Sequence, residues 1–242
     1  MIEEVVYTSV QQGLDPTQSG YCVVAKTEDF SAAILDRIVM LSSFKAYESD
    51  NGLPTNYSHQ FFRQDGKRIH VWSRVGYGGK DYTGRDCIFA HHIASTSSTR
   101  FAAAGPAWVC ATKQLFYKAW TAEPSFLKTR QLPVGDYDIE QCRIWESRVG
   151  SDKFAKFIAK KIQEKDPRPL YIVFDPNLRM LPLLVEAIAL VPKAIRWRVT
   201  FNTLYTHLVP KFDCLIRCVV KGSPEHKNAE KNLGQIIDLS AK

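Results

Sequence analysis

Hydrophobic and polar residues alternate along much of the first 95 residues, and this period of two predicts β-strands. The strands are expected at residues 5–10, 21–26, 57–62, 68–75 and 85–94. The first two are expected to pair antiparallel, and Asp65-Gly66 predicts a tight hairpin between the third and the fourth. Apolar residues at helical spacing predict one helix from about Thr27 to Phe44 and another from Pro106 to about Trp120.

The second half of the chain changes to helices and strands in turn. A helix is expected after Ser151-Asp152, and the wholly apolar run Leu170–Phe174 is typical of a central strand. A helix from about Leu178 to Leu190 follows, and then two alternating segments, residues 196–205 and 212–220. This order predicts a βαβ crossover and an antiparallel hairpin, and residues 236–239 are expected to add an edge strand.

The two halves are joined by residues 121–140, which carry Pro124, Pro133 and Gly135 without any periodicity. We therefore predict a mixed α/β (α+β) fold with a boundary near residue 140. Residues 1–140 would form an antiparallel-rich lobe of mixed β-sheet with two helices, and residues 141–242 an α/β lobe. The alternative, in which both lobes pack as one continuous domain, stays open.

The composition suits a chain that buries a core, because 45% of its 242 residues are hydrophobic. No stretch approaches the ~20 apolar residues of a membrane span. The acidic start, Met1-Ile2-Glu3-Glu4, is unlike a secretory signal. Six cysteines are scattered singly, at positions 22, 87, 110, 142, 214 and 218. We expect buried free thiols, a cytoplasmic protein and no membrane partner.

The net charge of +7 is unevenly distributed along the chain. Residues 1–147 hold 15 of the 32 Lys and Arg and 16 of the 25 Asp and Glu, whereas residues 148–242 hold the other 17 and 9. Such asymmetry suits nucleic acid, an acidic partner or a membrane surface, although a scattered basic surface is commoner. The best polyanion candidates are cations on or beside the two late strands: Arg196, Arg198, Arg217 and Lys221. The alternative is that they make ordinary ion pairs.

Candidate chemistry is concentrated between Asp81 and His92, where a turn leads into a short apolar run and two adjacent histidines. Adjacent strand residues point to opposite faces, so His91 and His92 would not converge on one metal ion, and Cys-x-x-Cys spacing is absent. We expect no metal and no cofactor. One histidine is expected to be hydrogen-bonded at the core edge and the other exposed. Alternatively, Arg85 and one histidine line an anion pocket or act as acid and base.

Two further features of the sequence each allow a functional and a structural interpretation. Asp175 follows the predicted strand Leu170–Phe174, at the end where open α/β sheets bind ligands. It would hold a metal or a ribose there, or cap the next helix. His70, Trp72 and Arg74 share one face of their strand, which suits base stacking or a sheet face covered by a helix. No phosphate-binding loop follows the apolar strand, so the chain is not itself a GTPase of that type.

Short blocks of sequence carry a family resemblance. They are Tyr7-Thr8-Ser9, Asp81-Tyr82-Thr83-Gly84-Arg85, Phe89-Ala90-His91-His92, Gly105-Pro106-Ala107-Trp108, Leu181-Pro182-Leu183-Leu184 and Gly222-Ser223-Pro224-Glu225. Together they resemble the N-terminal domain of the bacterial GTPase-associated proteins. The blocks run in order from residue 7 to about residue 225 and so cover nearly the whole chain. On this resemblance the chain would end about where a middle domain begins.

The resemblance implies a domain that works with a GTPase and further components in bacterial, defence-related systems, with no catalytic activity attached. Our first hypothesis is therefore a non-enzymatic adaptor module with protein partners, among them a GTPase or its associated components. The alternatives are an enzyme with an Arg/His acid–base site and a nucleic-acid binder that uses the basic second half. Whether the chain is a short family member or a fragment stays open.

Overall fold

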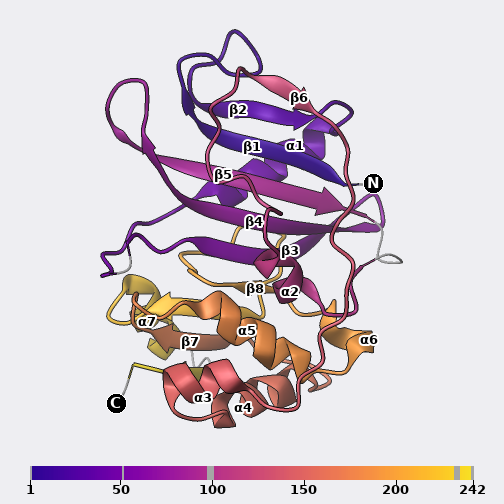
Figure 1. The fold of residues 1–242 in the computed structure, drawn as a ribbon, viewed down its shortest axis with the longest axis vertical. Helices are drawn as coiled ribbons and strands as arrows, with labels where there is room; N and C mark the ends of the chain where they lie inside the picture. The colour runs from indigo at the N-terminus through magenta and orange to yellow at the C-terminus, as the bar shows by residue number, and fades with distance from the viewer. Residues whose placement is uncertain (1, 51, 97–100, 232–234, 241–242) are drawn as a thin grey trace.

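Ten strands form a single mixed sheet in the computed structural model, which describes residues 2–50, 52–96, 101–231 and 235–240. The strand order is β10-β7-β9-β8-β3-β4-β5-β1-β2-β6, and helices lie against both faces. Figure 1 shows β6 near one end of this sheet and β7 near the other. The predicted mixed α/β class is confirmed.

The antiparallel strands of the first half form the centre and one end of the sheet. They are β1 (Glu3–Val10), β2 (Gly20–Thr27), β3 (Asn56–Gln64), β4 (Lys67–Lys80) and β5 (Asp86–Ser95). The predicted antiparallel pairing of β1 with β2 is confirmed, and so is the hairpin between β3 and β4. Its two turn residues, Asp65 (φ 49°) and Gly66 (φ 73°), both have positive φ, as a type I′ turn requires.

Both faces of these antiparallel strands are covered. One face packs beneath α1 (Ala32–Val39) and the 3-10 helix η1 (Met40–Ser42), which bury Ile38 and Leu41 against Phe62. The other lies beneath α2 (Pro106–Ala111) and the irregular chain that leads past β6 (Ser125–Leu127), a short strand parallel to β2. The predicted helix to about Trp120 is wrong beyond Ala111, because Leu115 and Phe116 are buried from irregular chain and not from a helical face.

The strands of the second half are parallel to one another. They are β7 (Leu170–Phe174), β8 (Phe201–Asn202), β9 (Ile216–Val220) and β10 (Gln235–Asp238). The central strand, the βαβ crossover and the edge strand are confirmed. The antiparallel hairpin is wrong: β8 is parallel to β9 and antiparallel to β3. Between β8 and β9 the chain crosses back and buries Val209 and Phe212 in the core beneath α1, so β9 enters the sheet in the same direction as β8.

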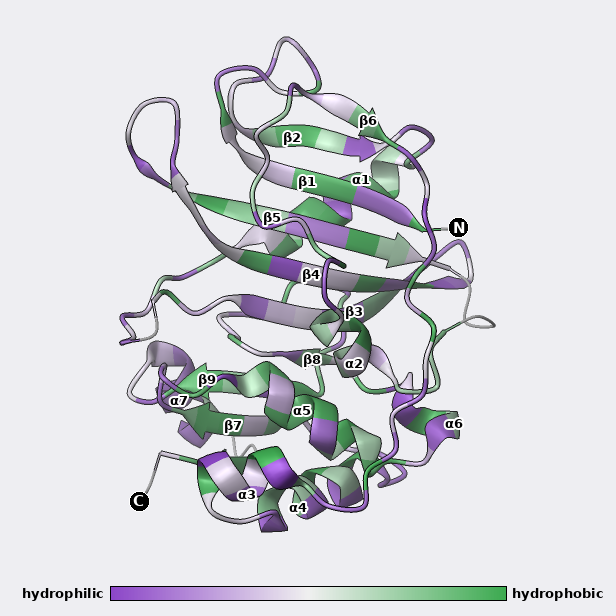
Figure 2. Ribbon diagram, viewed as in Figure 1, coloured by the Kyte–Doolittle hydropathy of each residue, from purple (hydrophilic) through white to green (hydrophobic). Residues whose placement is uncertain are grey.

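The helices of the second half enclose the parallel strands. They are α3 (Arg143–Val149), α4 (Lys153–Ile162), α5 (Met180–Ala189), α6 (Lys193–Arg196) and α7 (Pro224–Lys231). In Figure 2, α5 is largely hydrophobic, as its position in the main core requires. The predicted strand over residues 196–205 is wrong at its start, where α6 and irregular chain precede β8. Trp197 and Val199 are apolar there because they pack into the core.

The sheet and the main core both continue across residue 140. The pairing of β3 with β8 places His59 beside Phe201 and so joins the two halves of the sheet. The main core contains Trp72 from β4 as well as Leu183 from α5. All six cysteines are buried free thiols, as expected. No helix in the described part of the chain combines the length and the apolar character needed to cross a bilayer.

Candidate functional site

His91 and His92 are both completely buried in the middle of β5, and their ring nitrogens bond to protein groups on opposite faces of the sheet. His91 Nδ1 accepts the N–H of Tyr117 (3.0 Å), so its Nε2 donates to Glu4 Oε2 (3.0 Å). His92 lies between Ser42 Oγ (2.9 Å) and Ser73 Oγ (2.7 Å). The predicted opposite orientation is confirmed. The expectation that one histidine is exposed is wrong, because β5 is a central strand covered on both faces.

Burial keeps both histidines neutral near pH 7. It lowers the pKa of His91, and it lowers the pKa of His92 to about 3. Burial raises the pKa of Glu4, but hydrogen bonds from Arg130 and His91 outweigh it and leave that pKa below its ordinary value. Glu4 therefore stays ionised against Arg130, which donates to both carboxylate oxygens (2.8 and 2.7 Å). The contacts around these histidines hold the sheet and its covering chain together.

Arg85 lies far from this network, at the tip of the β4–β5 hairpin. Its side chain is 73% exposed, and its Nε donates to Thr83 Oγ1 (2.8 Å). Six residues of extended chain separate it from His91, a distance of about 20 Å at the usual rise per residue. The predicted pairing of Arg85 with a histidine, as an anion pocket or as acid and base, is therefore not assembled in the structure.

Asp175 is exposed just beyond β7 and accepts the backbone N–H of Asn177 (2.9 Å). This contact makes a local turn, and α5 begins only at Met180. The expectation that Asp175 caps the helix is wrong, because the turn separates it from the first helical residue. No group of three or more His, Cys, Asp and Glu side chains suited to a metal ion occurs among the described residues.

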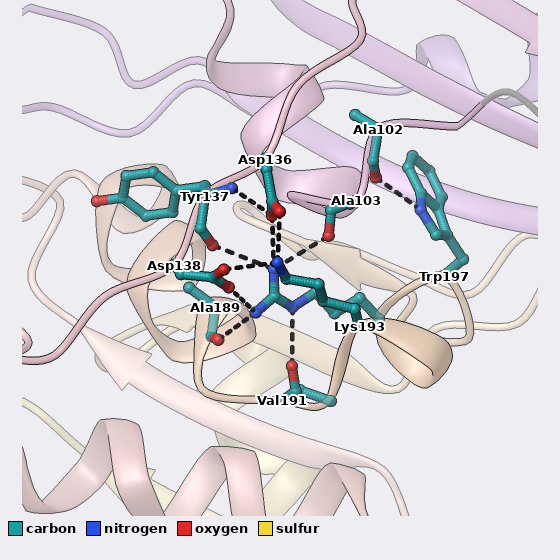
Figure 3. Close-up of polar contacts among 10 residues, drawn as sticks. Ala102, Ala103, Asp136, Tyr137, Asp138, Ala189, Val191, Lys193 and Trp197 are labelled. Carbon is teal, nitrogen blue, oxygen red and sulfur yellow. Dashed lines mark hydrogen bonds and ion pairs between the residues drawn. The ribbon is translucent and has the colours of Figure 1, made fainter.

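Arg196 is buried in the joint between the two halves, not on a basic surface. Figure 3 shows residues of this joint from both halves, among them Ala103, Tyr137 and Asp138 from one and Ala189 and Val191 from the other. The Arg196 guanidinium donates to four backbone carbonyls and also bonds to a carboxylate oxygen of Asp138 (3.2 Å). The carbonyls belong to Ala103 (3.0 Å), Tyr137 (3.1 Å), Ala189 (2.6 Å) and Val191 (2.8 Å). Arg196 therefore ties chain segments on both sides of residue 140 to the end of α5.

The other polyanion candidates, Arg217, Arg198 and Lys221, differ in their surroundings. Arg217 Nη1 donates to Tyr171 Oη (2.6 Å), and its guanidinium lies 5.3 Å from the ring centre of Tyr171 and 5.1 Å from that of Tyr205. Arg198 and Lys221 are exposed. Arg196 lies on α6 inside the protein and Arg217 is held between two tyrosines, so neither side chain stands free on an exposed basic face.

The aromatic face of β4 is buried as well. His70 and Trp72 are 3% and 0% exposed, beneath the side chains of Phe101 and Trp197. His59 Nδ1 donates to the Val199 carbonyl (2.7 Å), and its Nε2 lies 3.0 Å from His70 Nδ1. Nucleic-acid bases cannot stack on this face, because Phe101 and Trp197 cover it. The structure has the other predicted arrangement, a covered sheet face.

A cavity of about 420 Å³ lies between β3–β4 and the loop that leads from β7 into α5. Its wall includes apolar side chains and three cations. The apolar group is Leu53, Tyr57, Phe174, Leu178, Met180 and Leu181, and the cations are Arg74, Lys118 and Arg179. No Asp or Glu is among the described residues that line it. The cavity lies beyond the end of β7, where the sequence suggested a ligand site. Asp175 itself is not part of its wall.

Arg74 of this wall was predicted only as part of the aromatic face of its strand, not as a residue of a ligand site. It lies in β4, paired with Tyr57 on one side and His91 on the other, and is only 9% exposed. Its Nε and Nη1 find no hydrogen-bond acceptor in the described part of the protein. The signal in the sequence is the shared face of Arg74 with two aromatic residues of β4. That alternation predicts a buried position, where an arginine needs a partner.

Comparison with known families divides the chain into two matches. Residues 1–133 match GTPase-associated protein 1, N-terminal domain type 2, and residues 145–241 match GTPase-associated protein 1, middle domain. The chain belongs to the GTPase-associated protein 1 family. Neither curated proteins nor solved structures give a match to it.

The family assignment confirms the resemblance and corrects its extent. The blocks after residue 145 belong to the middle domain, not to an N-terminal domain that spans nearly the whole chain. The cavity has walls from both parts of this family member: Tyr57, Arg74 and Lys118 come from the N-terminal match, and Phe174, residues 176–182 and Thr203 from the middle-domain match.

Proposed function

We propose that this member of the GTPase-associated protein 1 family is a non-enzymatic adaptor that docks protein partners, among them a GTPase or its associated components. The family assignment supports the link to a GTPase. The proposal includes the bacterial, defence-related setting that the resemblance implies, and a division into two units near residue 140. The observation that carries the adaptor role is the tip of the β4–β5 hairpin.

The end of the β4–β5 hairpin, residues 77–86, stands out from the body of the protein in Figure 1. Tyr21 of β2 accepts the N–H of Ile88 (3.0 Å) beside it, and we call residues 77–86 together with Tyr21 the hairpin tip. It presents three exposed tyrosines, Tyr21 (47%), Tyr77 (40%) and Tyr82 (52%). Tyrosine and arginine are enriched at protein interfaces because they combine a large contact area with polar groups. The exposed Arg85 of the same tip adds a cation to this surface.

Internal hydrogen bonds hold the hairpin tip in one shape. Asp81 accepts the N–H and the hydroxyl of Thr83 (2.8 and 2.6 Å), the N–H of Arg85 (3.1 Å) and the hydroxyl of Ser9 (2.9 Å). These bonds, with the Thr83 hydroxyl first, hold the pKa of Asp81 well below its ordinary value. Tyr77 donates to Asp86 (2.8 Å). A braced surface loses little conformational entropy on binding, which favours a docking role.

The test is a purification of the tagged chain from its source organism, with the co-purifying proteins identified by mass spectrometry. We expect a GTPase to co-purify with the wild type. The amount recovered with Tyr82→Ser should be at least about fivefold lower. Phe157→Ser, an exposed aromatic residue on α4, is the matched control and should retain the partner. Both variants remove exposed rings, so circular dichroism should show folded proteins. Absence of a GTPase with the wild type, or equal recovery with Tyr82→Ser, would refute the proposal.

A further inference from the structure

We infer that the cavity between β3–β4 and the start of α5 binds a phosphate monoester whose organic part is apolar or aromatic. Arg74 of β4 lies in the wall of this cavity. Its Nε and Nη1 carry three of the five N–H groups of a guanidinium, and neither atom has an acceptor in the described part of the protein. A buried guanidinium with two unpaired nitrogens is costly, and an oxyanion in the cavity would supply acceptors.

The remaining charge around the cavity also favours an anion. Lys118 and Arg179 line it from opposite parts of the chain, and both are exposed, so they can turn toward a ligand. No carboxylate of the described lining residues opposes them. Three cations match a doubly charged phosphate ester better than a singly charged carboxylate.

The start of α5 contributes backbone donors to the same cavity. Met180, Leu181 and Pro182 of its first turn lie in the wall, and the first two carry backbone N–H groups, whereas Pro182 has none. The N-cap residue Arg179 makes no side-chain capping hydrogen bond. Free N–H groups and the positive end of a ten-residue helix are a usual setting for phosphate. Arg74 approaches from the antiparallel strands, so the anion would be held from two sides.

The size and the lining of the cavity imply more than inorganic phosphate. Its volume of about 420 Å³ falls within the range of small-molecule pockets. Phe174, Met180 and Leu181 provide apolar surface on one side, and Tyr57 provides an aromatic ring on the other. An ester group that carries an apolar or aromatic body would fill this space, whereas phosphate alone would leave it to water.

The test titrates the whole protein with phenyl phosphate, inorganic phosphate and phenol at constant ionic strength, by calorimetry and by thermal unfolding. Phenyl phosphate is expected to bind and to raise the melting temperature. Phosphate should bind more weakly, and phenol should not bind measurably. Arg74→Met is expected to weaken phenyl phosphate at least about tenfold, because it removes the buried cation. Arg148→Met, an exposed arginine on α3 that does not line the cavity, is the matched control and should bind like the wild type.

Each outcome decides the inference. No binding of phenyl phosphate up to about 10 mM would overturn it, as would equal binding by Arg74→Met. Phosphate binding as tightly as phenyl phosphate would overturn the assignment of an organic part. If Arg74→Met does not fold, Lys118→Met replaces it, since Lys118 is exposed and its removal should still weaken binding several-fold. These results are independent of the GTPase purification, which tests a different surface.

Discussion

Replacement of Arg196 by leucine tests whether this side chain joins the two halves of the protein. Arg196 is 3% exposed and bonds to the carbonyls of Ala103, Tyr137, Ala189 and Val191 and to the carboxylate of Asp138. Leucine fills part of the same volume but donates no hydrogen bond. The four carbonyls would then lose a charged donor inside the joint shown in Figure 3.

The size of the effect follows from these five contacts. Hydrogen bonds to a charged group contribute about 1.5–3 kcal/mol each, which would amount to roughly 7–15 kcal/mol if they were additive. They are not additive, because the variant no longer desolvates a guanidinium and the loop around Asp138 can admit water. Removal of one partner from a buried ion pair typically costs about 3–5 kcal/mol. We therefore expect the free energy of unfolding to fall by about 4 kcal/mol.

Urea unfolding at neutral pH, followed by tryptophan fluorescence and circular dichroism, measures this loss. Arg198→Leu is the matched control, because Arg198 is exposed only two positions away and should change stability by less than about 0.5 kcal/mol. Arg196→Lys should fall between the two, since lysine keeps the charge but has three donors on a single nitrogen. An Arg196→Leu variant within about 1 kcal/mol of Arg198→Leu would refute the proposed role of the joint.

Two further predictions concern the core and its histidines. Burial lowers the pKa of His92 to about 3 and that of His70 to about 4, whereas the unfolded chain takes up these protons below about pH 6.5. The stability from the neutral histidines is therefore complete well above that pH. On acidification it should fall by up to about 1.4 kcal/mol per histidine and pH unit, which urea titrations between about pH 7 and pH 5 would measure. A flat profile would contradict this. Gly135→Ala would place a Cβ 2.6 Å from the Trp108 ring, and should lower the free energy of unfolding by about 1–3 kcal/mol. Val134→Ala, at a neighbouring position that is 72% exposed, is its control, and equal stability of the two variants would show that the ring moves aside freely.

Elements that depend on neighbouring residues are readable from the amino-acid sequence. The hairpin at Asp65-Gly66 needs two residues with positive φ between alternating strands, and both requirements are local. The run Leu170–Phe174 is apolar at every position, as a strand covered on both faces must be. The opposite orientation of His91 and His92 follows from the pleat alone.

Elements whose residues contact a distant segment are not readable from the local pattern. Residues 196–205 alternate, yet Trp197 and Val199 are apolar because they contact the core from irregular chain. The direction of β9 could not be foreseen either. It depends on Val209 and Phe212 crossing to a core that is built mainly from the first 95 residues.

The candidate site depends most on contacts between distant residues. Arg196 and Arg198 differ by two positions in the chain, but one bonds to carbonyls 93 and 59 residues away and the other is exposed. Arg74 finds no acceptor for Nε and Nη1 among the described residues, and it shares a cavity wall with the segment that leads from β7 into α5. Periodicity specifies which face of an element a residue occupies. It does not specify which remote segment packs against that face. That packing determines whether the residue is buried and which groups it pairs with.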